Sequence, residues 1–203
     1  MNKAFYLFAG AVSWPVTKFA YRLEARGVEN VPKTGGLVLA ANHTSNFDPW
    51  PLGMPLYPGR TLRFMAKIEL FNPALKPFLD AVGAFPVRRG EADHEAIETA
   101  VRLAREGDIV VMFPEGTRRQ KGLRKKFQPK PHTGAARIAL AAKVPLVPAA
   151  VKGTDRLARL GPLRVIYGRP IPLDDLGERP LREAAQIGTD RLMAEIEKLH
   201  AKL

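Results

Sequence analysis

The sequence predicts an α/β fold in which helices flank a mixed, largely parallel sheet. Short apolar runs alternate along the chain with helix-like segments, a pattern typical of parallel strands joined by helical crossovers. The chain has 203 residues, of which 46% are hydrophobic and 26% are charged. This fits one ordinary globular domain and excludes a mainly disordered protein. The chain contains no cysteine, which excludes disulfides, thiolate metal ligands and a cysteine nucleophile.

Five apolar segments are predicted to be strands. Residues 36–41 (GLVLAA) and 109–113 (IVVMF) are apolar throughout, as is typical of buried strands, and residues 61–66 (TLRFMA) alternate. Pro145 and Pro148 lack the backbone N–H that a central strand donates. A strand containing them is therefore expected at a sheet edge or with irregular pairing. The remaining two predicted strands are residues 144–151 and 163–167.

Helices are predicted in the main body wherever apolar residues recur at helical spacing. In the first, Asn72 is a good N-cap residue and Pro73 takes the first helical position. In the second, Asp93 is expected to cap the helix and Gly107 to end it. The last is a long amphipathic helix. The predicted segments are residues 71–82, 94–105, 133–143 and 181–203.

Residues 1–24 are expected to form a helical segment at a membrane interface, ahead of a main domain at residues 25–203. Residues 4–17 carry no charge, but a membrane-spanning helix needs about 20 apolar residues. The Trp14–Pro15 pair is expected to bend or break the segment. Six of the 16 aromatic residues lie in the first 21 positions, and aromatic side chains near Lys and Arg suit an interface. The alternative is a helix packed on its own domain.

The positive charge of the chain is concentrated in one block. With 32 Lys and Arg against 20 Asp and Glu, the formal net charge is +12 and the pI is about 10.2. Such values usually suggest nucleic-acid binding. However, residues 116–154 hold 10 basic residues and no acidic one, and the rest of the chain has a net charge of only +2. One local basic block predicts a site for an anionic partner or surface.

The first candidate for chemistry is the segment 42–49 (NHTSNFDP), which follows a predicted strand. Open α/β sheets bind ligands beyond the carboxyl ends of their strands. His43 is suited to general-base catalysis, and Asp48 is spaced to accept the imidazole N–H across a tight turn. The alternative is that Asn42, Ser45 and Asp48 are helix-capping residues. The segment alone favours neither interpretation.

The second candidate is the segment 113–119 (FPEGTRR), which also follows a predicted strand. Gly116 allows a close backbone approach, Thr117 offers a hydroxyl, and Arg118 is able to bind a phosphate through two hydrogen bonds. The alternative is a strand-to-loop turn with solvated arginines. The glycine-rich phosphate loops G-x-x-x-x-G-K-[ST] and G-x-G-x-x-G are absent from the sequence.

Together, the two segments resemble the motifs of the glycerolipid acyltransferase family. Residues 42–49 match its N-H-x-x-x-x-D motif, and residues 113–118, roughly 70 positions later, match its E-G-T-R motif. Residues 83–89 (GAFPVRR) and 144–148 (VPLVP) resemble its looser third and fourth blocks. Residues 66–70 (AKIEL) resemble a Lys-x-Glu-Leu element of bacterial members. The most similar group is that of the bacterial 1-acylglycerol-3-phosphate acyltransferases.

The resemblance implies a role for each matched residue. His43 would be the general base that removes the proton from the acceptor's sn-2 hydroxyl, and Asp48 would orient and polarise it. Arg118 would be the main ligand of the acceptor phosphate. No metal site is indicated, because no cluster of ligands completes one around His43 and Asp48. The residues matched to substrate binding are Glu115, Gly116, Thr117 and Arg118, with Lys67 and Arg88 as further phosphate contacts.

The resemblance also implies an activity and a location. The enzyme would acylate lysophosphatidic acid to phosphatidic acid with acyl-CoA or an acyl-carrier protein as donor, and it would need no cofactor. It would lie peripherally or monotopically on the cytoplasmic face of the cell membrane, with an anionic membrane surface and no nucleic acid as partner. One alternative is the same chemistry on glycerol 3-phosphate, a lyso-ornithine lipid or another lysophospholipid. The other is a non-catalytic anion-binding module.

Overall fold

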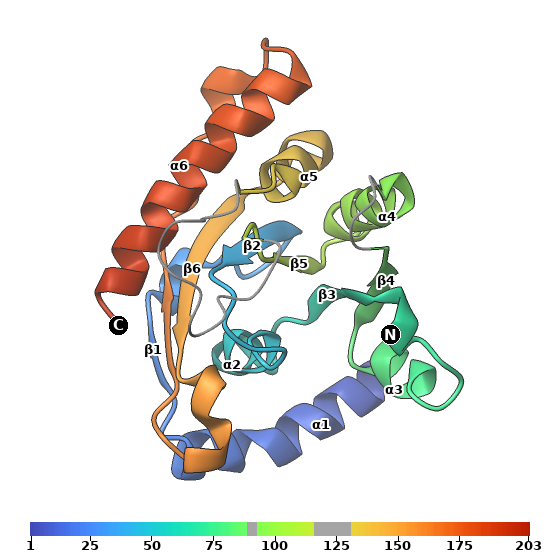
Figure 1. The fold of residues 1–203 in the computed structure, drawn as a ribbon, viewed down its shortest axis with the longest axis vertical. Helices are drawn as coiled ribbons and strands as arrows, with labels where there is room; N and C mark the ends of the chain where they lie inside the picture. The colour runs from blue at the N-terminus through green and yellow to red at the C-terminus, as the bar shows by residue number, and fades with distance from the viewer. Residues whose placement is uncertain (89–92, 116–130) are drawn as a thin grey trace, which may run out of the picture.

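The computed structural model describes residues 1–88, 93–115 and 131–203, and it has the predicted α/β architecture (Figure 1). In these residues seven strands form one sheet with the order β1-β7-β6-β2-β5-β3-β4. Neighbouring strands are parallel except for β6 and β7. The strands are β1 (Glu24–Arg26), β2 (Leu37–Ala41), β3 (Leu62–Lys67), β4 (Ala84–Val87), β5 (Ile109–Met112), β6 (Leu146–Lys152) and β7 (Arg164–Tyr167).

Helices cover both faces of the sheet. On one face α4, α5 and α6 form a core with the strands, and on the other face α2 does so. Figure 1 shows α1 running along the lower part of the molecule, with α3 near its N-terminal end. The helices are α1 (Lys3–Pro15), α2 (Pro49–Gly53), α3 (Lys76–Ala81), α4 (His94–Arg105), α5 (Gly134–Ala142) and α6 (Leu181–Ala201).

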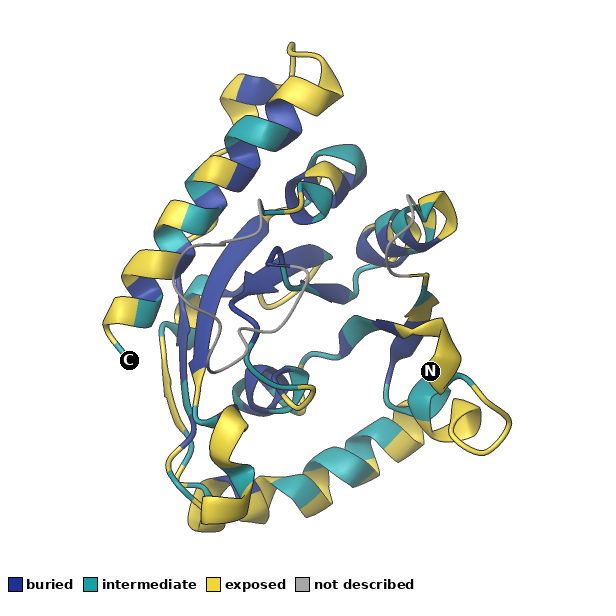
Figure 2. Ribbon diagram, viewed as in Figure 1, coloured by how far each residue is buried: buried dark blue, intermediate teal, exposed yellow. Residues whose placement is uncertain are grey.

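The central strand β2 is buried on both faces, which explains its unbroken apolar sequence. Val38 and Ala40 belong to the core under α4, α5 and α6, whereas Leu37, Leu39 and Ala41 belong to the core under α2. This alternation follows the two-residue period of a strand. Figure 2 shows the same burial as a dark centre of the sheet around β2 and β6. The strand that leads to His43 is therefore firmly anchored.

The place of β6 corrects the prediction of an edge or irregular strand. β6 lies inside the sheet, parallel to β2 and antiparallel to β7. Pro145 precedes the strand. Pro148 accepts a hydrogen bond from the Gly168 N–H (2.8 Å) just past the last β6–β7 pair, Ala149 and Tyr167. The nitrogen and the carbonyl of a strand residue point to the same side, so the nitrogen of Pro148 faces β7 at the end of the β6–β7 ladder. Its missing N–H therefore interrupts neither the pairing with β2 nor that with β7.

The sequence pattern does not reveal the two outermost strands. All three residues of β1 are exposed, and β4 is only four residues long and contains Pro86, which argues against a strand. β1 pairs with β7 and β4 pairs with β3. Backbone pairing with β7 places β1, whereas β4 is placed by its pairing with β3 and by the buried side chains of Ala84 and Phe85.

Helices α1, α4, α5 and α6 occupy predicted segments, α3 is shortened, and α2 lies where no helix was predicted. Asp93 caps α4 by accepting a backbone N–H at 3.1 Å, and Gly107, with φ +100°, follows the end of that helix. Both were predicted. In the predicted helix at residues 71–82, however, α3 begins only at Lys76. The reason is that the Asn72 side chain accepts two backbone N–H groups at 3.1 Å and closes a separate turn first.

The N-terminal helix α1 packs on the main body through small and polar residues. Gly10 lies against Tyr57, where an added Cβ would come within 2.4 Å of a ring carbon. The Tyr57 hydroxyl donates to the Leu7 carbonyl at 2.9 Å, and the Tyr6 hydroxyl accepts from the Leu62 N–H at 3.2 Å. On this face, α1 is a helix packed on its own domain, which was the alternative to a membrane-interface helix.

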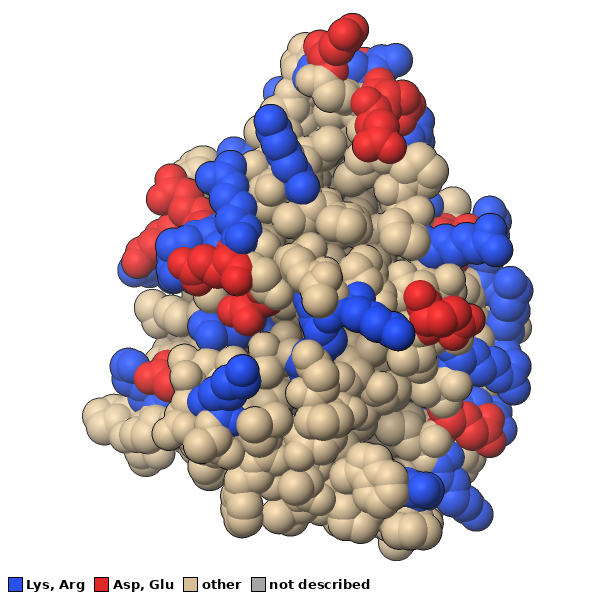
Figure 3. Space-filling model, turned by 180° about the vertical axis from the view of Figure 1, so that it is seen from behind, with Lys and Arg blue, Asp and Glu red and all other residues tan. Residues whose placement is uncertain are grey.

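The opposite face of this helix is apolar and exposed. Past Pro15 the chain continues as a π-helical turn, Val16–Ala20, so the proline changes the helix type at the predicted break. Five large side chains recur every three or four residues and are 38–69% exposed. We call them the apolar stripe: Phe5, Phe8, Val12, Val16 and Phe19. Figure 3 shows few charged side chains on the lower part of the rear face.

The predicted boundary between residues 1–24 and 25–203 stays a prediction, and β1 begins at Glu24. Among the helices of the described ranges, none combines the length and apolarity that crossing a membrane requires.

Candidate active site

The carboxyl ends of five parallel strands meet at one edge of the sheet. Four of the predicted site residues lie there: His43 after β2, Glu115 after β5, Lys67 at the end of β3 and Arg88 after β4. The strand that leads to Lys67, β3, is the second strand from β2 across the sheet, and the strand that leads to Arg88, β4, is the third. With strands about 4.8 Å apart, these offsets are about 10 Å and 14 Å along the sheet.

His43 and Asp48 are in direct contact. Nδ1 of His43 lies 2.8 Å from Oδ2 of Asp48, and the two residues are 4% and 0% exposed. An ionised carboxylate only accepts hydrogen bonds, so Nδ1 carries a proton, and in the neutral imidazole the lone pair is on Nε2. The contact expected from the spacing is present, and it gives the imidazole the tautomer that a general base requires.

Further hydrogen bonds hold Asp48 as an anion. Oδ2 accepts the backbone N–H groups of Thr44 (2.7 Å) and Ser45 (2.9 Å). Oδ1 accepts the hydroxyls of Thr154 (2.5 Å) and Thr44 (3.2 Å). Burial disfavours the charged form, but the hydrogen bonds from His43, Ser45, Thr154 and Thr44 outweigh it. Together they hold the pKa of Asp48 below its ordinary value.

The Asp48 side chain serves His43 rather than capping α2. Asp48 precedes α2, but its carboxylate turns back toward Thr44 and Ser45. α2 is itself fixed to the sheet, since Leu52 is 0% exposed and its carbonyl accepts the Tyr167 hydroxyl at 2.8 Å. Asp48, at the start of this anchored helix, is therefore held in place from both sides.

Asn42 joins the ends of β2 and β6. Its side-chain amide donates to the Val151 carbonyl and accepts from the Val151 N–H, each at 2.9 Å. The side chain therefore makes the two hydrogen bonds to β6 that a backbone residue of β2 would make, one residue after β2 has ended. This allows His43, the next residue, to turn out of the strand while the strand end stays paired. Capping, the alternative for Asn42, is not its role.

The end of β5 reaches the site through Phe113. Its ring stacks on the His43 imidazole, with the ring centroids 4.2 Å apart and the planes at 18°. This contact fixes the plane of the imidazole. Glu115 follows two residues later and is buried. Gly116, Thr117 and Arg118 lie outside the described residues, as does the stretch 116–130 of the basic block.

Lys67 and Arg88 are exposed. The Arg88 guanidinium lies 3.6 Å from the Glu95 carboxylate in an exposed pair, and its backbone N–H donates to Asp93 at 2.7 Å. The sheet brings both cations to the edge that holds His43. Their contact with a phosphate stays a prediction.

Sequence reasoning missed Thr154. It lies 106 positions from Asp48, between two predicted strands and at the end of the basic block. The available signal was its place: it comes just after β6, the strand next to β2, and ligand-contacting residues gather beyond such strand ends. Gly153, with φ +100°, marks the tight turn that places it.

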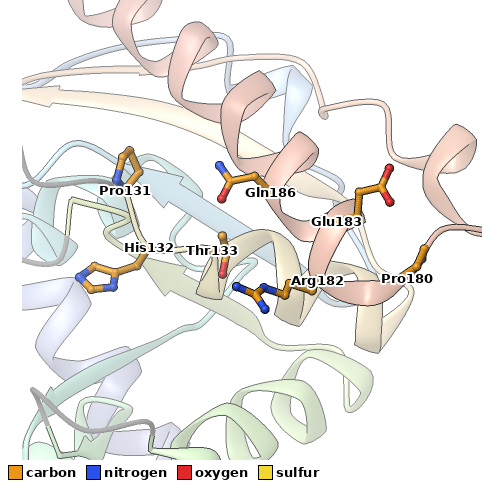
Figure 4. Close-up of a pocket in the computed structure, with 7 residues that line it drawn as sticks. All are labelled: Pro131, His132, Thr133, Pro180, Arg182, Glu183 and Gln186. Carbon is orange, nitrogen blue, oxygen red and sulfur yellow. The ribbon is translucent and has the colours of Figure 1, made fainter.

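A separate cavity of about 820 Å³ lies between the starts of α5 and α6 (Figure 4). Its lining includes His132, Thr133, Arg182 and Gln186, and none of the residues predicted for the reaction. The His132 N–H donates to the Pro114 carbonyl at 2.8 Å, which links this cavity to the end of β5. Across the described ranges, no three His, Cys, Asp or Glu side chains gather in a way that would hold a metal ion.

Comparisons with known proteins find relatives along most of the chain. A protein-family model described as "Acyltransferase" matches residues 22–152. The 1-acyl-sn-glycerol-3-phosphate acyltransferase of Bacillus subtilis is 36% identical over 179 residues, which cover 86% of each chain. The chloroplast protein of that name from Brassica napus is 29% identical over 163 residues, which cover 74% of this chain but only 45% of the plant protein.

The fold is also found among solved structures. The crystal structure of the 1-acyl-sn-glycerophosphate acyltransferase from Thermotoga maritima superimposes with a TM-score of 0.63. The match covers 97% of this chain and 87% of the other, at 23% sequence identity. At that identity, the likeness concerns the arrangement of helices and strands.

Proposed function

Because the chain belongs to the acyltransferase family, we propose that it transfers an acyl group to the sn-2 hydroxyl of 1-acylglycerol 3-phosphate, giving phosphatidic acid. The donor is an acyl thioester, either acyl-CoA or an acyl-carrier protein. The observation that best supports the chemistry is the 2.8 Å contact between His43 and Asp48 beyond the carboxyl end of β2. The acceptor is inferred from the names of the Bacillus and Brassica relatives.

The proposed reaction uses the imidazole as a proton carrier. Nε2 of His43 removes the hydroxyl proton while the acceptor oxygen attacks the thioester carbonyl carbon. The tetrahedral intermediate collapses by breaking the C–S bond, and the leaving thiolate takes the proton back from the imidazolium. Asp48 stabilises the imidazolium in between. No enzyme nucleophile is needed, which suits a chain whose only serines are Ser13 and Ser45.

The acceptor phosphate is assigned to the segment Glu115, Gly116, Thr117 and Arg118, with Arg118 as its main ligand. Lys67 and Arg88 are assigned as further contacts at the same sheet edge. The exposed pair of Arg88 with Glu95 is of a kind that contributes about 0–1 kcal/mol, so a phosphate competes with it easily. The chemistry requires no cofactor, because the imidazole supplies the base. Incubation with EDTA is therefore expected to leave the rate unchanged.

The membrane is the proposed partner of the apolar stripe. These side chains are exposed, although Phe5 also contacts Phe78 of α3, and they lie on a helix whose other face is docked. Lys18 lies 4.4 Å from the centre of the Trp14 ring, so a cation and an aromatic ring sit together as at a membrane interface. We assign the protein to the cytoplasmic face of the cell membrane as a peripheral or monotopic enzyme, because acyl thioesters are found on that side.

The test of the activity is acyl transfer from radiolabelled acyl-CoA to a panel of acceptors, with the products resolved by chromatography. We expect phosphatidic acid from lysophosphatidic acid, and no product with His43→Ala. The matched control is His94→Ala, since His94 is an exposed histidine at the start of α4. Product only from glycerol 3-phosphate or another lysolipid reassigns the acceptor. Retained activity in folded His43→Ala overturns the mechanism, and anion binding without turnover supports a binding module instead.

The test of the membrane contact is sedimentation with liposomes that contain an anionic phospholipid. Replacing Phe8 and Phe19 together by Ser is expected to release the protein, because both side chains are more than 60% exposed on the apolar stripe. The control is Leu181→Ser, an exposed leucine at the start of α6. Equal sedimentation of all three proteins would remove the stripe from the membrane contact.

A further inference from the structure

We propose that Thr154 is a positioning residue that fixes the Asp48 carboxylate and, through it, the His43 imidazole. This inference rests on the catalytic roles proposed above for His43 and Asp48. The Thr154 hydroxyl donates to Oδ1 of Asp48 at 2.5 Å. It also lies 2.9 Å from the hydroxyl of Thr44. Thr154 is 3% exposed and Asp48 0%, so water does not substitute for this hydroxyl.

The two oxygens of Asp48 have different partners. Oδ2 accepts the His43 N–H and the backbone N–H groups of Thr44 and Ser45. Oδ1 accepts hydroxyls, of which Thr154 at 2.5 Å is nearer than Thr44 at 3.2 Å. The Thr44 hydroxyl has one proton and two candidate acceptors, Oδ1 and the Thr154 oxygen. Thr154 is therefore the nearer of the two hydroxyls at Oδ1, the oxygen that the three N–H groups at Oδ2 do not hold.

The backbone after β6 holds Thr154 in this position. Gly153 has φ +100°, and a Cβ there would lie 2.5 Å from the Pro162 carbonyl oxygen. The Gly153 carbonyl in turn accepts the Arg156 N–H at 3.1 Å. A hydroxyl from the end of β6 therefore locks a carboxylate that orients a base at the end of β2. Base and restraint come from neighbouring strands of one rigid sheet.

The experiment compares Thr154→Val with Thr154→Ser and with Thr189→Val. Valine keeps the shape but not the hydroxyl, and serine keeps the hydroxyl. Thr189 is a buried threonine of α6 whose hydroxyl bonds to its own helix at 2.7 Å. We expect T154V to lower kcat by about 10- to 100-fold, as misplacement of a catalytic group does, with unchanged KM for acceptor and donor. We expect T154S to recover most of the loss and T189V to show none.

Proton NMR provides a readout that a merely structural role would not move. The far-downfield signal of the His43 Nδ1 proton, absent in His43→Ala, is expected to be lost or shifted in T154V and restored in T154S. If T154V does not fold, Thr154→Ala against T154S makes the same comparison.

Three outcomes bear on the inference. A folded T154V with wild-type kcat and an unchanged Nδ1 signal overturns it, and so does T154S as poor as T154V. In either case, inactive His43→Ala would leave the proposed function standing. Active His43→Ala would overturn the proposed function itself.

Discussion

Two regions of the sheet edge that holds His43 are built differently. Beyond β2 and β6, His43, Asp48 and Thr154 are buried and joined by hydrogen bonds, and Asn42 ties the two strand ends together. Beyond β3 and β4, Lys67 and Arg88 are exposed. We call the first group, His43, Asp48, Thr154 and Asn42, the rigid half of this edge, and the second group, Lys67 and Arg88, the open half.

The difference corresponds to the two tasks of the proposed reaction. Proton transfer requires groups held within a few tenths of an ångström, which calls for buried, fully bonded side chains. Binding a phosphate that arrives from a membrane requires cations that water and substrate both reach. If this division is correct, substitutions in the rigid half lower kcat or stability, and those in the open half change KM.

The largest effect is expected from Asp48→Asn. The carboxylate accepts five hydrogen bonds, two of them from hydroxyls at Oδ1, and an amide NH2 would face donors at one of its two positions. The imidazolium formed during proton transfer would lose the anion that stabilises it, and the corresponding Asp-to-Asn change costs about 10⁴-fold in kcat in serine proteases. Steady-state kinetics on the folded variant is the measurement. A loss of less than tenfold would contradict the rigid-half assignment.

The same pair predicts a pH dependence of stability. The pKa of Asp48 is lower in the folded protein than its ordinary value of about 3.9. Its ionisation therefore stabilises the fold above that ordinary value, and the contribution is lost as the pH falls through the lower, folded pKa. In urea denaturation, the gap between wild type and Asp48→Asn should be constant near neutral pH and narrow only below about pH 4. A gap unchanged down to pH 3 would contradict the assignment.

An intermediate effect is expected from Asn42→Ala. The substitution leaves the N–H and C=O of Val151, a residue that is 0% exposed, without their side-chain partner. Each of the two orphaned groups costs about 1–3 kcal/mol, so the free energy of unfolding should fall by about 2–6 kcal/mol. Denaturant unfolding measures it. The control is Asn46→Ala, an exposed asparagine of the same segment, which should change stability little.

The smallest effects are expected in the open half. Lys67→Ala should raise the KM for the lysolipid two- to fivefold with kcat unchanged, since an exposed charge contributes about 0.2–1 kcal/mol. Arg88→Ala should do less, because Glu95 already competes for its guanidinium. A fall in kcat without a change in KM in either variant would move that residue into the rigid half.

The sequence predicted the fold class and the central strands because their side chains carry the signal. β2 and β5 are apolar through burial, and α4 has a clear cap in Asp93. β1 escaped prediction because its exposed residues are held through the backbone by β7, and β4 because it is short and contains Pro86. The predicted position of β6 was wrong because Pro148 lacks the N–H of a central-strand residue. That the pairing with β7 ends next to Pro148 is known only from the structure.

For the site, local spacing together with the family resemblance predicted the contact between His43 and Asp48, whereas contacts between strands were not predicted. Asp48 lies close to His43 in the chain, so one turn brings them together, and the pattern revealed both. Val151 lies in β6 and Thr154 just after it. Their contacts depend on strand order, which a single sequence does not encode in any local pattern. Phe113 was predicted as the end of a strand, and its stacking on His43 depends on the same strand order.

The pairing of Asn42 with Val151 also bears on the chemical ageing of the enzyme. Hydrolysis of an asparagine amide replaces its NH2 by an oxygen, which here would set an acceptor against the Val151 carbonyl in place of the 2.9 Å hydrogen bond. The ends of β2 and β6 would then repel each other beside His43. That hydrolysis requires water, and Asn42 is 2% exposed. The burial that aligns the two strands therefore also protects the residue whose slow decay would separate them.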